Sequence, residues 1–190
     1  MSRILLIRPP AVFASSSYSV PLTMPQATAY LAANLLKHGH EVQCLDALAE
    51  GIDHIGVSYA SSVRYRGLST EAIVDRIKSA PDAIGVTAQF SQDWPHIEGI
   101  INAIHAKFPD IPIIVGGEHA TALPEHTLNT CGAVKYVALG EGELTIVDFA
   151  EFLDGKREID SVQGICYRDA DGSVNRTPPQ PRVRTPDDLP

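Results

Sequence analysis

Glycine and hydroxyl side chains, rather than acid–base groups, occupy the positions at which this sequence is best suited to chemistry. A glycine pair, Gly116-Gly117, follows a short apolar run, and Gly140-Glu141-Gly142-Glu143 follows the next one. Because glycine has no Cβ, a ligand can come close to the main chain at such positions. The long segment 8–25 is rich in serine, alanine and proline, which suits hydrogen bonding by hydroxyl and backbone groups. These features favour ligand binding over catalysis by charged side chains.

Several common chemistries are excluded by missing residues. The sequence has no P-loop and no nucleophile elbow, and Gly-x-Gly at 140–142 lacks the third glycine of a dinucleotide fingerprint. The first apolar run ends in Arg8-Pro9-Pro10, without the acidic residues with which a phospho-receiver domain holds magnesium. His38 and His40 flank a helix stop, and His119 and His126 lack a fixed third ligand. We therefore assign no metal ligand and no catalytic residue.

The amino-acid composition and net charge exclude several classes of protein. The 190 residues are 44% hydrophobic and 20% charged, as in a soluble globular domain. The net charge of −8 and the absence of a basic run argue against a nucleic-acid partner. No apolar stretch approaches the roughly 20 residues that cross a bilayer, and the apolar start is too short for a signal peptide. We expect a cytoplasmic protein without a membrane span, whose three cysteines are reduced thiols.

Hydrophobic periodicity predicts an α/β fold in which strands and helices alternate. Short apolar runs are typical of strands buried on both faces, and periodic segments that end at Gly39, Pro81 or Pro109 are typical of helices. Asp93 is placed to cap one helix, and Ser69 or Thr70 another. The expected strands are 4–7, 41–45, 83–88, 111–115 and 134–139, and the expected helices are 26–38, 70–79, 93–108, 124–129 and 144–153.

This alternation predicts a Rossmann-like or flavodoxin-like parallel sheet of five strands with helices on both faces. Residues 1–155 would form that domain. Residues 156–190 would form a β-hairpin with an Asp-Gly turn and a proline-rich linker. In strand order 2-1-3-4-5, a ligand is expected beyond the carboxyl ends of the strands, at the switch point between the first strand and the strand 83–88. The segments at that edge are 8–25, 87–94, 116–121 and 140–143.

Nearly the whole chain resembles one known family. The residues that carry the resemblance are Ile4-Leu5-Leu6-Ile7-Arg8-Pro9-Pro10, the strand entry 81–87, the segments 115–121 and 139–143, and the start of the hairpin at 164–168. In this order they resemble the cobalamin-binding domain that precedes the radical SAM barrel in B12-dependent radical SAM proteins. Each motif alone is common, and the combination is specific.

The resemblance implies a site for the nucleotide tail of cobalamin. Thr87-Ala88-Gln89 takes the place of the family's Ser-x-Leu, with Gln in place of Leu, and Gly116-Gly117 takes the place of its Gly-Gly. A tryptophan at Gly117 would then fill the tail slot and leave the fold intact. The expected cofactor-binding residues are Ser16, Ser17, Tyr18, Thr87, Gln89, Ser91, Gly116, Gly117, His119, Gly140, Glu141 and Gly142.

Two departures from related families shape the functional expectation. Residues 8–30 contain no histidine, so the Asp-x-His-x-x-Gly segment that supplies cobalt's lower ligand in methionine-synthase-like domains is missing. The chain also lacks Cys-x3-Cys-x2-Cys, so SAM and a [4Fe-4S] cluster would belong only to a partner radical SAM barrel, in cis in a longer parent or in trans. By itself the chain would not be an enzyme. Its parent would be a methyltransferase or an oxidative cyclase.

The sequence is also compatible with two other functions. A domain that keeps the B12-binding fold without the cofactor would serve as an interaction domain, as the missing histidine motif permits. A flavodoxin-like flavin binder would use the serines between residues 15 and 19 as a phosphate cradle.

Overall fold

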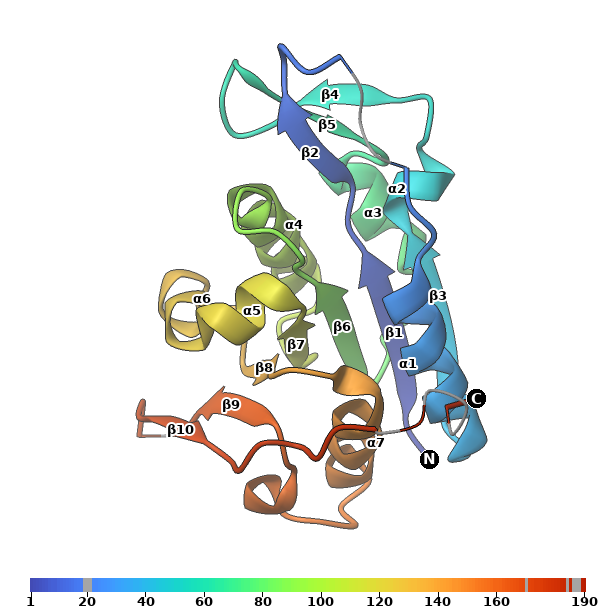
Figure 1. Cartoon of the computed structure of the whole chain (residues 1–190), viewed down its shortest axis with the longest axis vertical. Coiled ribbons are helices and arrows are strands. Elements are labelled where there is room, and N and C mark those ends of the chain that lie inside the picture. Colours follow the sequence, from blue (N-terminus) through green and yellow to red (C-terminus); the bar gives the residue numbers. More distant parts are fainter. Residues whose placement is uncertain (19–21, 170, 184, 186–188) are drawn as a thin grey trace.

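A computed structural model describes residues 1–18, 22–169, 171–183, 185 and 189–190. Its main element is a seven-stranded sheet of order β10-β9-β8-β7-β6-β1-β3 (Figure 1). The five strands β3, β1, β6, β7 and β8 are parallel, which confirms the predicted order 2-1-3-4-5. Their bounds are β1 Arg3–Arg8, β3 Glu41–Asp46, β6 Ala83–Thr87, β7 Ile113–Gly116 and β8 Tyr136–Ala138.

Helices cover both faces of the sheet, as the sequence predicts. Strand β1 shows why, because Ile4 and Leu6 belong to one buried cluster while Leu5 and Ile7 belong to the other. Alternate side chains of a strand point to opposite faces, so a strand buried on both faces is apolar throughout. One face packs against α1 (Gln26–Lys37) and α7 (Gly142–Leu153). The other packs against α3 (Thr70–Arg76), α4 (Trp94–Lys107), α5 (Glu118–Ala122) and α6 (Pro124–Thr130).

Several helix ends follow the sequence signals, but α3 ends at Arg76 and not at the expected residue 79, and the predicted cap of α4 is not formed. Gly39 adopts φ 79° just after α1, and Ser69 Oγ accepts from the N–H of Ala72 at 3.2 Å at the start of α3. Asp93 occupies the N-cap position of α4, but its side chain makes no capping hydrogen bond. Its φ and ψ of −85° and −18° are helical, whereas a capping residue is normally extended. The prediction that Asp93 caps α4 is therefore wrong.

The C-terminal hairpin is part of the main sheet. Strand β9 (Ile165–Arg168) pairs antiparallel with β8, and β10 (Val174–Arg176) pairs with β9. Val162, before β9, is buried, and a 3-10 turn at Ile159–Ser161 leads into it. The proline-rich residues that follow contain no helix or strand where the structure describes them. They still contact the domain, since the Gln180 side-chain amide donates to Asp148 at 3.3 Å.

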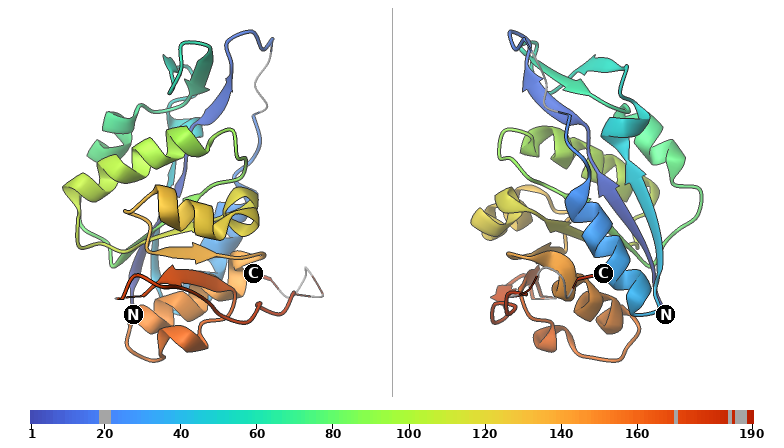
Figure 2. Two further views of the ribbon diagram at one scale, coloured as in Figure 1. Left: turned by 90° about the vertical axis from the view of Figure 1, so that its left-hand side faces the viewer. Right: turned by 45° about the vertical axis from the view of Figure 1, so that its right-hand side comes forward.

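A second, three-stranded sheet was not predicted from the sequence. It consists of β2 (Ala11–Ala14), β5 (Val63–Arg66) and β4 (Ile55–Val57) in that order, all antiparallel. Helix α2 (Ala47–Glu50) precedes β4 in the chain. Strands of three or four residues carry too little alternation to be recognised. This small sheet and the β9-β10 hairpin lie at opposite ends of the molecule (Figure 2). Within the described part of the chain, no helix is long and apolar enough to cross a membrane.

Candidate functional site

A groove of about 680 Å³ opens at the carboxyl ends of β1 and β6. This is the switch point of the sheet, because α1 after β1 and α4 after β6 lie on opposite faces. The groove is lined by Arg8, Pro9, Pro10, Ala11, Val12, Thr23, Met24, Pro25, Gln26, Ala27, Thr28, Leu48, Thr87, Gln89, Phe90, Ser91, Gln92, Asp93 and Ile97. It contains three of the predicted site residues, Thr87, Gln89 and Ser91.

Small side chains form a row beside this groove. Thr87, Gly116 and Ala138 end the neighbouring strands β6, β7 and β8, and by strand alternation all three point to the face covered by α1 and α7. A Cβ added at Gly116 would meet only the Cβ of Ala138, at 3.6 Å. The space above the row is bounded where Leu31 of α1 approaches Gly142 of α7. These small side chains leave space at the sheet edge beside Gly116, here called the slot, next to Thr87 in the groove wall.

Gly117 has a different role from its neighbour. Its φ of 114° and ψ of 179° lie in a region essentially limited to glycine, and a Cβ there would stand 2.5 Å from the carbonyl oxygen of Ala88. The N–H of His119 donates to that same carbonyl at 3.2 Å. Gly117 thus closes the turn from β7 into α5 and faces the protein's own backbone. The expectation that Gly117→Trp would leave the fold intact is wrong.

Arg8 places a charge at the end of β1. Its guanidinium pairs with Asp46 at 3.1 Å and donates to Thr23 Oγ1 at 3.0 Å. These contacts tie the end of β1 to the end of β3 and to the segment that leads into α1. Because the charge of Arg8 is matched by Asp46, the groove wall at this point is polar but locally neutral.

His119 lies beneath the surface. Its side chain is 3% exposed, its Nδ1 lies 2.9 Å from Ser91 Oγ, and its ring stacks on Trp94 with 4.9 Å between ring centroids. Burial, and secondarily the nearby His126, lower the pKa of His119. His119 is therefore a neutral, buried ring that contacts the Ser91 hydroxyl from the interior of the domain. Trp94 is buried as well and donates through Nε1 to Thr130, so it packs inside the domain instead of lining the groove.

Asp93 is the ionisable residue of the groove whose environment is most unusual. Burial raises the pKa of its carboxyl to about 6, and the Gln92 side chain offsets this only in part. Its Oδ1 is buried and has no hydrogen-bond partner among the described residues. The sequence placed Asp93 in the segment 87–94 at the expected ligand edge but assigned it only a capping role, so Asp93 was not among the predicted binding residues.

Other predicted site residues do not line the groove. Ser16, Ser17 and Tyr18 follow β2 at the far end of the small sheet and are exposed, and Ser19 lies outside the described residues. The N–H of Gly140 donates a hydrogen bond to Thr121 Oγ1 of α5 at 2.9 Å. Glu141 precedes α7 and is exposed. Contact of these residues with a cofactor stays a prediction.

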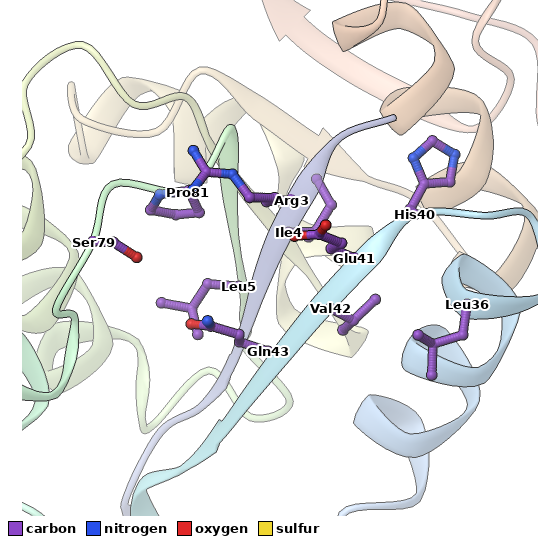
Figure 3. A pocket seen from close by; sticks show the side chains of 10 residues that line it. All are labelled: Arg3, Ile4, Leu5, Leu36, His40, Glu41, Val42, Gln43, Ser79 and Pro81. Atoms are coloured by element: carbon purple, nitrogen blue, oxygen red, sulfur yellow. The ribbon is translucent and has the colours of Figure 1, made fainter.

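A second, smaller hollow of about 340 Å³ lies at the opposite edge of the sheet. Figure 3 shows that its lining falls on both sides of β1 and β3, with Leu36 and Val42 on one side and Ser79 and Gln43 on the other. It thus surrounds the amino end of an edge strand. Ligands of parallel sheets bind at the carboxyl ends of the strands, so we assign the functional site to the groove at the switch point.

Comparison with known proteins identifies the family. A family model of the B12 binding domain matches residues 19–150. The chain belongs to the B12-binding domain family. Residues 19–150 include the carboxyl ends of β6, β7 and β8, where the groove and the row of small side chains lie.

Two methyltransferases are similar in sequence to this B12-binding domain. Cytidylyl-2-hydroxyethylphosphonate methyltransferase of Streptomyces wedmorensis is 33% identical over 185 residues, which cover 95% of this chain and 34% of that protein. The uncharacterized methyltransferase PH0819 of Pyrococcus horikoshii is 29% identical over 190 residues, or 99% of this chain and 37% of that protein. The chain thus spans about a third of the length of these relatives.

Solved structures share the fold. The cobalamin-dependent S-adenosylmethionine radical enzyme OxsB with aqua-cobalamin bound matches with a TM-score of 0.74 at 22% identity, over 100% of this chain and 24% of that one. The radical S-adenosylmethionine methyltransferase TsrM from Kitasatospora setae, with cobalamin and a [4Fe-4S] cluster bound, matches with a TM-score of 0.70 at 22% identity, over 97% and 30%. The B12-binding domain therefore corresponds to one part of much longer enzymes.

Proposed function

We propose that this chain is the cobalamin-binding module of a B12-dependent radical SAM enzyme. The observation that carries the proposal is the row of small side chains Thr87, Gly116 and Ala138, of which Thr87 lines the groove at the switch point. The slot above this row is suited to a flat nucleotide tail. The groove alone is smaller than a whole corrinoid, which suits a domain that holds one side of the cofactor and leaves the other side to a partner.

Different residues of the chain would make different contacts with the cofactor. Thr87 and Ser91 offer hydroxyl groups, and Gln89 offers an amide that can donate and accept. Gly116 keeps the slot open, and Thr28 on α1 lines the neighbouring groove. The Arg8–Asp46 pair holds the neighbouring loop in place. Apolar groove residues such as Ile97 and Met24 exclude water from the enclosed surface.

The lower face of the cofactor would rest on side chains other than histidine. The segment after β1 contains no histidine, and none of the described groove-lining residues is histidine or cysteine. We propose that the parent enzyme therefore uses cobalamin without a histidine ligand from this loop. The same absence separates the chain from methionine-synthase-like domains.

The chemistry would come from the cofactor and a partner domain. When bound, cobalamin supplies a transferable methyl group or one-electron chemistry. SAM and a [4Fe-4S] cluster would be held by a radical SAM barrel, in cis or in trans, and the parent reaction would be methyl transfer or oxidative cyclisation. The relatives support both reactions, since an anaerobic magnesium-protoporphyrin IX monomethyl ester cyclase of Rubrivivax gelatinosus is 28% identical over 120 residues, or 61% of this chain and 21% of that protein.

Retention of hydroxocobalamin after gel filtration tests the proposal. The wild-type chain is expected to elute with corrin absorption bands. Gly116→Leu should fill the slot and lose retention by at least tenfold, while its circular dichroism and melting temperature stay close to wild type, because the Cβ at this site meets only Ala138. Gly99→Leu is the matched control, since a Cβ there meets no atom within 4 Å and the residue lies away from the groove.

The alternatives give different outcomes in the same experiment. A wild-type chain that elutes colourless would support a cofactor-free interaction domain. A yellow chain with flavin absorption would support a flavodoxin-like flavin-binding function. Corrin retention that is unchanged in Gly116→Leu would mean that the slot is not where the nucleotide tail lies.

A further inference from the structure

The Asp93 side chain is not explained by the helix that it precedes. It stands at the N-cap position of α4 but accepts no hydrogen bond from the first N–H groups of that helix. Its helical φ and ψ turn the side chain away from those groups. A carboxylate at this position therefore contributes no capping bond to the fold.

Within the described residues, the Asp93 carboxyl also lacks a compensating charge. Its Oδ1 is buried without a hydrogen-bond partner, and none of the ion pairs includes it. Burying a carboxylate without partners costs free energy, so an unsatisfied one in a native structure requires an explanation. The raised pKa of Asp93, about 6, reflects the same burial. These properties are typical of a group whose partner arrives with a ligand.

Arg8 and His96 each have a partner other than Asp93. Arg8, which also lines the groove, is paired with Asp46 on β3. His96, one turn along α4, contacts Ser58 through Nδ1 at 2.9 Å and stacks on Tyr65 of the small sheet. Neither residue forms an ion pair with Asp93. The Gln92 side chain offsets the effect of burial on the carboxyl only in part, and Oδ1 is left without a donor among the described residues.

The rest of the groove wall indicates the kind of donor. Gln89 and Gln92 flank Asp93 with neutral amides, and Ser91 adds a hydroxyl. This part of the groove wall therefore offers one carboxyl, two amides and a hydroxyl, which can bind uncharged ligand groups that donate through N–H. The periphery of a corrin ring carries several such groups, the carboxamides. We propose that Asp93 accepts a hydrogen bond from a side-chain carboxamide of the corrin ring. This inference rests on the proposed function and adds a specific binding residue to it.

Binding affinities of variants test this role. Asp93→Ala should weaken binding of hydroxocobalamin about 10- to 100-fold, the range expected for a lost hydrogen bond to a charged group. Asp93→Asn keeps an acceptor oxygen without the charge and should lose less. Glu98→Gln, which removes a carboxylate from the same helix outside the groove, is the control and should bind as wild type.

The pH dependence of binding gives a second readout. Wild-type affinity should rise several-fold between pH 5 and pH 7 and then level off, because the ionised Asp93 is the better acceptor. Asp93→Asn should lose this rise. In the ligand-free chain at pH 7.5, Asp93→Asn should melt at the same or a higher temperature, since it removes an unpartnered buried carboxylate. A lower melting temperature would instead indicate a structural role and contradict the proposal.

Cobinamide, which keeps the corrin carboxamides but lacks the nucleotide tail, distinguishes the possible contacts. The loss caused by Asp93→Ala should be the same for diaquocobinamide as for hydroxocobalamin. A loss seen only with hydroxocobalamin would place Asp93 against the tail and overturn the proposal. If the wild type binds cobalamin and Asp93→Ala binds it equally well, this inference fails alone. If the wild type binds neither corrinoid, the proposed function fails with it.

Discussion

Gly116 and Gly117 are adjacent in sequence, but the structure gives them different tasks. Gly116 keeps a slot open beside Thr87 and Ala138, whereas Gly117 makes a turn that other residues cannot make. The sequence motif treats them as one unit that lines a ligand slot. Only the dihedral angles and the position of the Ala88 carbonyl separate the residue expected to affect binding from the one expected to affect folding.

Gly117→Ala is expected to destabilise the fold by about 1–3 kcal/mol, the usual cost of forcing a side chain into this backbone conformation. Urea denaturation monitored by circular dichroism measures this change. Gly99→Ala is the comparison, because Gly99 lies within α4 with no atom near its Cβ. That substitution should stabilise the chain by about 0.5–1 kcal/mol. Equal stability of Gly117→Ala and wild type would refute the assigned role of Gly117.

At the scale of elements, the small sheet supports one wall of the groove through a few aromatic and polar contacts. The Tyr65 ring of β5 stacks on His96 of α4 with 4.6 Å between centroids, and Tyr59 donates to the carbonyl of Gln92 at 3.1 Å. Since Gln92 lines the groove, the position of the small sheet determines the shape of that wall. Residues 47–68, which the sequence left without a role, therefore contribute to the candidate site.

The attachment of the small sheet should weaken in mild acid. Burial lowers the pKa of His96 in the folded chain. As the pH falls below about 6.5, the ordinary histidine value, His96 is therefore protonated first in molecules in which the small sheet is detached or the chain is unfolded. The contribution of His96 to stability is present above that pH and is lost as the pH falls through its folded pKa. Hydrogen exchange of β4 and β5 should therefore be faster at pH 5.5 than at pH 7.5, relative to the intrinsic rate.

His96→Phe provides the matched variant, since it keeps a ring for Tyr65 and removes the titrating group. Its exchange in β4 and β5 should depend much less on pH, while exchange in β1 and β6 should stay as slow as in wild type. An equal pH effect in both proteins would assign the acid sensitivity to another group, such as Asp93.

At the scale of the whole molecule, the C-terminal hairpin completes the sheet. Val162, Ile165, Cys166 and Tyr167 are buried in the two core clusters, and β9 covers the edge of β8. Each fully buried apolar side chain contributes about 1.5–3 kcal/mol, so four of them approach the roughly 5–15 kcal/mol by which a domain is stable. The hairpin thus belongs to the same buried core as the walls of the candidate groove.

A chain that ends at residue 155 should therefore lose cooperative thermal unfolding or aggregate through the exposed edge of β8. A chain that ends at residue 182 is the control and should melt within a few degrees of the full chain, because the described residues beyond it form no helix or strand. Cooperative unfolding of the chain 1–155 at the wild-type temperature would show that residues 156–190 form a separate unit.

The sequence by itself determined the order of the parallel strands, the alternation of helices and the edge at which the groove lies, because these follow from local periodicity and from the handedness of strand crossovers. It also located Thr87, Gln89 and Ser91 at that edge. The tertiary structure alone decided that Gly117 faces the backbone, that His119 is buried and that Asp93 lies unpaired in the groove wall. These facts depend on dihedral angles and on contacts between segments far apart in the chain, which neither residue type nor spacing encodes.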